Sequence, residues 1–525
     1  MNKLDVIIRY WEIVNHLINH EGMRVIYIHK NGEEVWMEDD RKEPFQIIRL
    51  AQKDFDWSRD VKVDIKNTYE QAKLIRKRVG LRSANVINVI LSPYEPVDSY
   101  KEFINQPLPF TAGGKHQQRT ILIPYDKIQS IFFPLATEWN LKDMPSFLPL
   151  PSLEDEGNYI RSLRYSVQNA SEMRHEQERK IFMFGKPIFT YLLLALIMIM
   201  FTIVEYYGSS QDVATLIEFG AKFNPYIHEG EWWRFFSSMF LHIGFLHLMM
   251  NSLALYFLGS AVERIFGTFR FIFIYFLAGF LGSVASFAFN EQVSAGASGA
   301  IFGCFGALLY FGLIHRRLFF RTMGMNVLVI LAINLAFGFL VPMVDNGAHI
   351  GGLVGGFVAS AIVGLPKHKI IKMKIIVIVF TIISFFGLLS YAYSQEESIQ
   401  TYAVFYQLGQ EHVQNDEYEE GKPYFERIVS GNLISAEPIL TETYFTLSYI
   451  QAQLGEYEDA RENLLKVLER EPDLQDAHYN LSLVYLELMQ YEDAYEHIQR
   501  ALAESPNDDK YLQIMRQINE LLKKD

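Results

Sequence analysis

Cysteine is almost absent from this sequence of 525 residues, which contains only Cys304. A lone cysteine excludes an intramolecular disulfide framework and any metal site built from several thiolates. Basic residues are outnumbered, with 48 Lys and Arg against 61 Asp and Glu, a formal net charge of −13. Because nucleic-acid binding depends on clustered Lys and Arg side chains, we expect no nucleic-acid partner. A small-residue cleavage site is also missing after the opening stretch MNKLDVIIRYWEIVNHL, so we expect an amphipathic helix there rather than a cleavable signal peptide.

Hydrophobic residues are unevenly spread along the chain. They make up 50% of it, yet the mean hydropathy is only +0.05. A strongly apolar block must therefore be diluted by polar flanks, and a chain of this length suggests about three domains.

Residues 1–180 are predicted to form a small cytoplasmic α/β domain with a linker helix. The turn Asn31-Gly32 between two strand-like runs is a hairpin signal. The candidate strands are Val25–His29, Glu34–Met37 and Ala84–Leu91, and Lys53–Val79 has mixed helical character. Glu38, Asp39 and Asp40 could form an acidic metal cluster, but their place beside turn signals favours a solvated loop.

Apolar runs follow from Pro187 onward, and runs of about 17–25 residues are long enough to cross a bilayer as helices. We find about seven, at Ile188–Val204, Ile243–Leu258, Phe269–Phe289, Ser298–Ile314, Asn326–Val344, Ala348–Leu365 and Ile375–Tyr393. They predict a mainly helical, polytopic membrane bundle over residues 185–394. The second, fourth and sixth runs are less purely apolar, because they also carry His, Asn, Ser and many Gly residues.

Lys and Arg cluster at alternate ends of these runs. They precede the first run and follow the second, fourth and sixth, as with Arg164, Arg179, Arg264, Arg270, Arg316, Arg317, Lys367 and Lys369. The opposite loops Asn290–Ala297 and Asp345–Gly347 contain none. By the positive-inside tendency, we expect a cell-membrane protein with a cytoplasmic N-terminal domain and an extracytoplasmic C-terminal domain.

A repeat of 34 residues occupies residues 399–525. Leu454–Ala460 (LGEYEDA) matches Leu488–Ala494 (LMQYEDA), and Pro472 and Pro506 keep the same offset. This period resembles that of tetratricopeptide repeats, which stack helical hairpins into a concave binding surface. The repeats are acidic, which either keeps the domain soluble or serves to bind basic protein segments.

Polar side chains gather at one depth, where three of the runs begin on the outer side. The second run begins near His242, with His247 and Asn251 one and two turns further in. The fourth begins at Ser298 and the sixth near His349. Taken alone, a serine in a span is usually structural, since its hydroxyl bonds back to the preceding turn. Several such groups at one depth in the bilayer are expensive and favour a functional site.

Glycines follow both the serine and the histidine at a spacing of four. They are Gly299 and Gly303 in the fourth run, and the pairs Gly351–Gly355 and Gly352–Gly356 in the sixth. Small residues at this spacing let helix backbones approach closely in lipid, and they could serve packing alone. If the two faces pack together, the Ser298 hydroxyl meets the His349 imidazole, which is the minimum for an activated nucleophile.

Five short motifs occur in order between residues 185 and 365. They are Trp233-Arg234, His242–Asn251 (HIGFLHLMMN), Glu263–Gly267 (ERIFG), Gly296–Gly299 (GASG) and Ala348–Gly356 (AHIGGLVGG). In this combination they resemble the rhomboid family of intramembrane serine proteases, here with C-terminal tetratricopeptide repeats. The resemblance implies a six-helix core, to which the seventh run, the repeats and the N-terminal domain are additions.

The resemblance also implies a Ser-His dyad that cleaves transmembrane segments near the outer leaflet. Ser298 would attack the scissile carbonyl, and His349 would take the serine proton and give it to the leaving amine. The family's oxyanion stabilisers correspond to His247, Asn251 and the Ser298 backbone amide.

Supporting roles are implied for Gly296, Gly299, His242 and Phe302. Phe302 stands where the family often has a tyrosine, and its ring can still pack on the histidine. The motifs require no metal and no organic cofactor.

Two other function classes fit parts of the pattern. A rhomboid-like binding protein would escort membrane proteins without cutting them, but it would not need the serine nucleophile. A transporter would use His242 and His247 as a metal or proton path, but such a relay would continue across the bilayer. The expected partners are membrane-protein substrates, the lipid bilayer and a protein ligand at the repeats.

Overall fold

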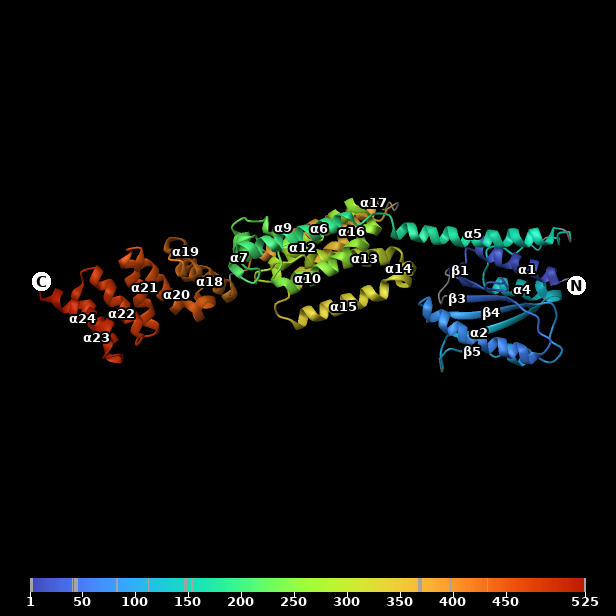
Figure 1. Cartoon of the computed structure of the whole chain (residues 1–525), viewed down its shortest axis with the longest axis horizontal. Helices are drawn as coiled ribbons and strands as arrows, with labels where there is room; N and C mark the ends of the chain where they lie inside the picture. The colour runs from blue at the N-terminus through green and yellow to red at the C-terminus, as the bar shows by residue number, and fades with distance from the viewer. Residues whose placement is uncertain are drawn as a thin grey trace. The chain divides into compact units, whose positions relative to one another are not determined.

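The computed structural model describes residues 3–523 except 40, 42–45, 82–83, 112, 146, 148, 153–154, 367–370, 396–397 and 432. The chain divides into two compact units, and many of their helices and strands are labelled in Figure 1. The first unit comprises Met1–Met183 and Arg316–Gly324, and the second comprises Phe184–His315 and Met325–Asp525. Asp40, Lys367 and Lys369, which the sequence singled out, lie outside the described residues.

A six-stranded mixed sheet forms the centre of the first unit, in the order β1-β2-β3-β4-β6-β5. The strands are Arg24–Ile28, Glu34–Asp39, Gln46–Gln52, Asn85–Ser92, Leu108–Pro109 and Gln117–Pro124. β1, β2 and β3 are antiparallel neighbours, whereas β4 runs parallel to β3 and β6. The predicted hairpin is confirmed. β3 and β6 were not predicted, because the sheet buries Arg49 and Gln118, whose polarity interrupts the apolar pattern.

Helices cover both faces of this sheet. α1 (Lys3–Asn15), α4 (Ile128–Glu138) and α5 (Glu156–Phe182) share one apolar core with Met37 of β2. α2 (Ser58–Arg78) packs on the other face, where Trp36 lies. Neighbouring strand residues point to opposite faces, so this arrangement confirms the predicted small α/β domain.

Glu38 and Asp39 correct one expectation of the sequence. They lie in β2 with only 1% and 2% of their surface exposed, not in a solvated loop. Glu38 accepts hydrogen bonds from Arg321 of α14 (Arg316–Thr322) at 2.7 and 3.0 Å, and Asp39 binds Arg41 at 2.9 Å. Buried carboxylates need such partners, and no local pattern reveals an arginine 283 residues away. Within the described ranges, no group of three or more His, Cys, Asp or Glu residues could hold a metal ion.

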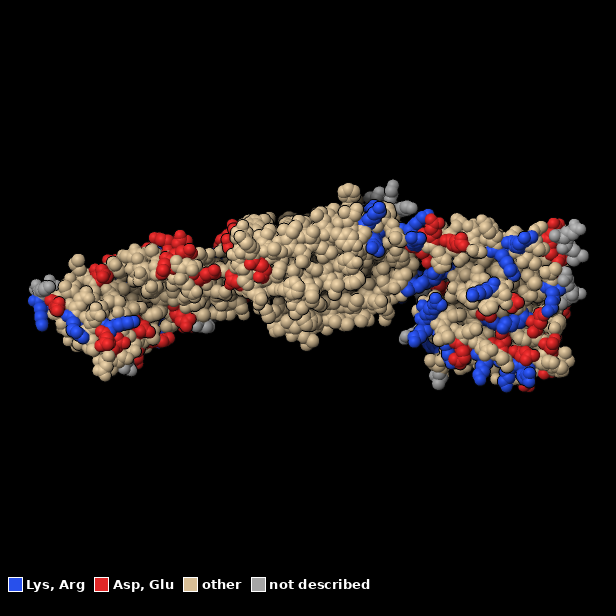
Figure 2. Space-filling model, viewed as in Figure 1, with Lys and Arg blue, Asp and Glu red and all other residues tan. Residues whose placement is uncertain are grey.

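Apolar helices make up the first part of the second unit. In the described part of the chain, five stretches are long and apolar enough to cross a membrane: α6 (Ile188–Tyr207), α10 to α11 (Gly244–Phe266), α12 (Thr268–Phe289), α16 (Asn346–Val363) and most of α17 (Ile371–Tyr393). α15 (Gly324–Leu340) qualifies only together with α14, and α13 (Ser298–Ile314) is apolar but shorter. Each predicted run thus coincides with an apolar helix, although five or six meet the criteria for a span. The face shown in Figure 2 carries almost no charge over these helices.

Glu263 joins the N-terminus of α6 to α11 (Ser260–Phe266). Its side chain is fully buried and accepts bonds from the Phe189 and Thr190 amides at 3.0 and 2.8 Å and from the Thr190 hydroxyl at 2.7 Å. The first amides of a helix have no partner within it, so Glu263 supplies one from another span. This contact gives the ERIFG motif its structural role.

Helices α18 to α24 form the rest of the second unit. They are Ile399–Gln414, Tyr418–Ser430, Leu433–Gln453, Tyr457–Arg470, Gln475–Glu487, Tyr491–Glu504 and Asp509–Leu522. Gly455 and Met489, 34 residues apart, both take positive φ values of 79° and 59° in equivalent interhelical turns. Ala460 and Ala494, at the same offset, are both fully buried. The predicted tetratricopeptide hairpins are confirmed.

Candidate active site

Glycines bring the backbones of α13 and α16 into direct contact. A methyl group added at Gly352 would overlap the carbonyl oxygen of Gly299, and one added at Gly356 would overlap that of Gly303. Because lipid offers helices no hydrophobic reason to associate, such close backbone packing is what holds them together. The contact also fixes the two helices in one register.

Ser298 and His349 occupy the first turns of these two helices. A methyl group placed on Gly299 would lie 3.3 Å from the carbonyl oxygen of Ala348. These two residues are the immediate neighbours of Ser298 and His349, so the serine and the histidine lie at the same end of the bundle. Both are half-buried. The structure therefore places the two predicted residues, which belong to separate glycine-faced helices, at the same end of the bundle.

Phe302 holds the imidazole of His349 from one side. The two rings stack with centroids 4.1 Å apart and planes 12° apart, and Phe302 is buried. The Nδ1 atom of His349 is also buried and has no hydrogen-bond partner in the described part of the chain. The ring of Phe302 thus packs on the imidazole as the sequence analysis expected, and a flat aromatic contact of this kind restricts ring rotation.

His247 and Gly296 meet beside the serine. Gly296 has φ +156°, and a methyl group added there would lie 2.9 Å from His247 Cε1. Only glycine allows the chain just before Ser298 to pass so close to this ring. The buried His242 accepts a hydrogen bond from the Ala297 amide at 3.4 Å, and its ring lies 5.3 Å from that of His247.

Asn251 lies one turn beyond His247 on α10 (Gly244–Ala254). Its side-chain amide donates to the His247 carbonyl at 3.2 Å. The residue is therefore tied to its own helix, and the described hydrogen bonds do not join it to the serine.

A small cavity of about 20 Å³ adjoins Ser298. That volume suits about one water molecule. Its lining includes Gly296 and Gly299, to which the sequence analysis gave supporting roles, and also Lys222 and Ser286. Lys222 and Asp345, whose carboxylate bonds to Ser286, were not singled out in the sequence. They are 123 residues apart, so no spacing rule links them.

The first interhelical loop, residues 208–243, is organised around Arg234. This buried guanidinium donates to the carbonyls of Ile217 and Ala221 at 2.6 and 3.1 Å and pairs with Glu231 at 2.5 Å. It also lies 4.7 Å from the Trp233 ring centroid. Satisfying two loop carbonyls with one buried cation gives the Trp-Arg motif a physical role.

The first repeat packs on this loop. The Phe223 ring meets Phe405 of α18 edge-on at 5.5 Å, and the Tyr226 and Tyr424 hydroxyls lie 3.4 Å apart. These side chains belong to one apolar cluster shared by the loop and the repeats. The repeats are therefore in contact with the segment that borders the site.

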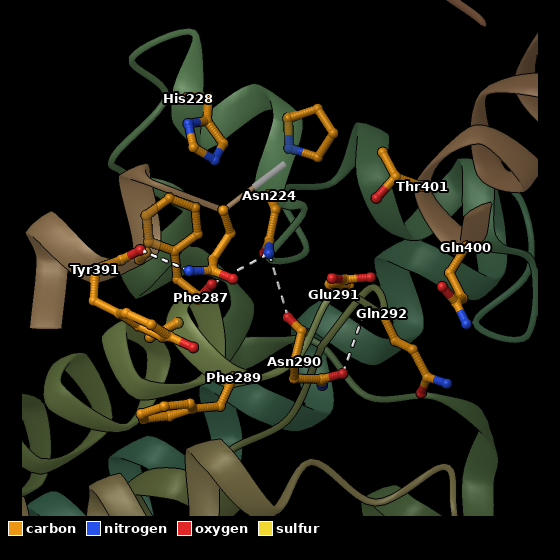
Figure 3. Close-up of a pocket in the computed structure, with 14 residues that line it drawn as sticks. Asn224, His228, Phe287, Phe289, Asn290, Glu291, Gln292, Tyr391, Gln400 and Thr401 are labelled. Carbon is orange, nitrogen blue, oxygen red and sulfur yellow. Dashed lines mark hydrogen bonds between the residues drawn. The ribbon is translucent and has the colours of Figure 1, made fainter. Parts of the chain in front are cut away.

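A larger pocket of about 430 Å³ lies where α8 (Asn224–His228) meets the ends of α12 and α17 and the start of α18. Figure 3 shows its polar lining, in which the Asn224 amide donates to the carbonyls of Phe287 and Asn290. Ser298 and His349 are not among its lining residues. It is thus separate from the candidate catalytic pair.

Known proteins share both parts of the second unit. Residues 229–366 match the Rhomboid domain model, and residues 402–430 and 445–509 match tetratricopeptide repeat models. Rhomboid protease GluP of Bacillus subtilis (strain 168) is 37% identical over 468 residues, which cover 88% of this chain and 87% of GluP.

Shorter matches are found in other organisms and proteins. RHOMBOID-like protein 5 of Arabidopsis thaliana is 38% identical over 31% of this chain and 55% of its own length. Putative rhomboid protease YdcA of Bacillus subtilis (strain 168) is 33% identical over 28% of this chain and 75% of its own length. With the apolar helices described above, these similarities establish that the chain belongs to the rhomboid family of intramembrane serine proteases and is a multi-pass membrane protein.

Proposed function

We propose that this protease cleaves transmembrane segments of membrane proteins near the outer leaflet, with Ser298 as nucleophile and His349 as general base and acid. The observation that carries the proposal is the backbone contact between α13 and α16, which puts both residues at one end of the bundle. Neither residue has another evident role in the described contacts.

The chemistry needs two proton transfers. His349 accepts the Ser298 proton as the hydroxyl oxygen attacks the scissile carbonyl, and it then protonates the departing amine. Water next attacks the acyl-enzyme ester, His349 takes a proton from that water, and Ser298 recovers a proton as the acid product leaves. Stacking on Phe302 supports this role, since a base must keep one orientation through both halves of the reaction.

The oxyanion would be stabilised by the Ser298 amide, His247 and Asn251. The contact of His247 with Gly296 supports its assignment, because that ring borders the chain leading into the serine. The side-chain amide of Asn251 carries two N–H groups, so one would donate to the oxyanion while the other keeps its bond to the His247 carbonyl. Each donor of this kind typically contributes about 3–4 kcal/mol to the transition state.

The domains are assigned to compartments by the charge of the connecting segments. Arg264, Arg270 and Lys374 lie at helix ends opposite the end that carries Ser298, and the positive-inside tendency makes that side cytoplasmic. Residues 1–180 would then be cytoplasmic, residues 185–394 the protease domain, and residues 399–525 extracytoplasmic. Protease protection of epitope tags at the two termini of intact cells tests this arrangement, and a protected C-terminal tag would contradict it.

The substrate proposal is tested by cleavage of a reporter membrane protein in liposomes, with mass spectrometry of the fragments. We expect cuts within or at the border of its span. Ser298→Ala and His349→Ala should abolish them, whereas Ser360→Ala should not, because the hydroxyl of that buried serine of α16 donates to the Gly356 carbonyl of its own helix. Undiminished cleavage by Ser298→Ala, or cuts confined to distant soluble loops, would contradict the proposal.

A further inference from the structure

Lys222 is a buried cation in the first interhelical loop, with only 1% of its surface exposed. It lies between α7 (Val213–Glu218) and α8. A buried ammonium is costly unless hydrogen bonds and an opposite charge compensate for the lost water. Its partners therefore indicate why it is there.

The first set of partners lies in the segment that leads to the serine. The Lys222 ammonium donates to the Asn290 carbonyl at 2.6 Å. Its backbone amide donates to the Ser294 carbonyl at 2.9 Å, and the Ser294 amide donates back at 3.0 Å. One residue thus makes three hydrogen bonds to the stretch that ends four residues before Ser298.

The second partner lies at the start of the helix that carries the histidine. Asp345 accepts a bond from the Ala348 amide at 2.9 Å and another from the Ser286 hydroxyl of α12. Its backbone carbonyl accepts from the His349 amide at 3.1 Å. Asp345 and Glu291 are the carboxylates whose charges act on Lys222. The carboxylate that caps α16 therefore attracts the ammonium, and Ser286, which bonds that carboxylate, lines one cavity together with Lys222.

We propose that Lys222 is a positioning residue, which holds the segment before Ser298 against the capped N-terminus of α16. The inference rests on the proposed roles of Ser298 and His349. Lys222, Ser286 and Ser298 line one small cavity, so this brace adjoins the proposed nucleophile. Loss of the ammonium would remove its hydrogen bond to the Asn290 carbonyl and the positive charge that attracts the Asp345 carboxylate, and would free the loop to shift.

Protonation of Lys222 should make the brace depend on pH. Burial lowers the pKa of Lys222 to about 8, against the opposing attraction of Asp345 and Glu291. The ammonium is therefore charged below about pH 8 and becomes neutral above it. Nucleophile reactivity should fall on the alkaline side, because the brace is lost as the proton leaves.

The test measures the rate of Ser298 labelling by a fluorophosphonate probe, together with kcat and KM, in the purified full-length protein. Lys222→Met and Asp345→Asn should each lower the labelling rate and kcat about 10- to 100-fold with little change in KM, since small misplacements of reacting groups have effects of this size. The double variant should have a labelling rate and kcat no lower than those of the less active single variant, because both changes disrupt the same interaction. Lys422→Met removes a lysine of the repeats that pairs with Glu456, and it should match the unaltered protein.

The pH dependence of Ser298 labelling distinguishes a positioning role of Lys222 from a role in stability alone. The unaltered protein should lose labelling above about pH 8, and Lys222→Met should lack that alkaline decline while keeping a cooperative thermal transition. If Lys222→Met fails to fold, two measurements still test the inference. They are the alkaline loss of labelling in the unaltered protein and the labelling rate of Asp345→Asn. Normal labelling of Lys222→Met, multiplicative effects in the double variant, or no alkaline decline in the unaltered protein would overturn the inference. Absence of label on Ser298 in the unaltered protein would instead contradict the proposed function.

Discussion

Small residues lie at the helix crossings of both the membrane bundle and the repeats, but they contribute to packing in different ways. α13 and α16 touch through bare backbone at Gly299 and Gly352, whereas the repeats keep a methyl group at Ala460 and Ala494. In water, burial of apolar surface drives such packing. In lipid that force is missing, and close approach of backbones replaces it. The bundle therefore tolerates less change, and its tightest contact is the one that carries the candidate dyad.

The largest effect is expected from filling the bundle contact. Gly352→Val would drive a side chain into the Gly299 carbonyl, so we expect cleavage and probe labelling to fall by at least about 100-fold. Gly387→Val is the matched control, since nothing lies within 4 Å of a methyl group at this glycine of α17. Equal activity of the two variants would break the comparison, because it would show that backbone contact does not set the site.

Removing the buried acceptor of α6 should have the next largest effect. Glu263→Gln keeps the shape but cannot accept the same bonds from Phe189 and Thr190, and it places an amide beside their donors. We expect the free energy of unfolding to fall by about 1–3 kcal/mol, measured by thermal or denaturant unfolding in detergent. Glu205→Gln, at the other end of α6, should cost less because its carboxylate is not buried. A larger loss of unfolding free energy in Glu205→Gln than in Glu263→Gln would contradict the role assigned to Glu263.

A smaller effect is expected at the ring that holds the histidine. Phe302→Ala removes the stack on His349, which is worth about 0.5–1.5 kcal/mol, so kcat/KM should fall about 2- to 12-fold from this term alone. Phe302→Tyr keeps the ring and should stay close to the unaltered protein. Steady-state cleavage of the reporter measures both, and a Phe302→Ala enzyme with unchanged kcat/KM would show that the stack does not orient the base.

The smallest effect is expected where the repeats meet the first interhelical loop. Arg427 and Glu229 form an ion pair there, with side chains 32% and 48% exposed. Exposed pairs contribute about 0–1 kcal/mol, so Arg427→Gln should barely change the thermal midpoint. Phe405→Ala should lower it clearly, because it empties the buried contact with Phe223. Larger destabilisation by Arg427→Gln would mean that charge, not burial, holds the repeats on the loop.

Much of the site could be predicted because its signals are local. The apolar runs predict that Ser298 and His349 share one depth in the membrane. Glycines at a spacing of four mark the helix contact, and the 34-residue period marks the repeats. Family membership then favours a protease over a non-cleaving escort or a transporter. The catalytic residues themselves remain predictions.

Other features could not be predicted because their partners are far away in sequence. Lys222 and Asp345 are ordinary polar loop residues until folding brings them together. Glu38 was predicted to lie in a solvated loop because it stands beside turn signals, whereas its partner Arg321 lies 283 residues away. Burial of charge depends on tertiary pairing, which no local periodicity encodes.

The central claim is that Ser298 and His349 act as one unit. Fluorophosphonate labelling of the purified protein, followed by peptide mapping, tests it most directly. We predict that the label is found on Ser298 and is lost in His349→Ala, while the thermal midpoint of that variant stays near that of the unaltered protein. Full labelling of Ser298 in a folded His349→Ala protein, or label on another serine, would contradict the account.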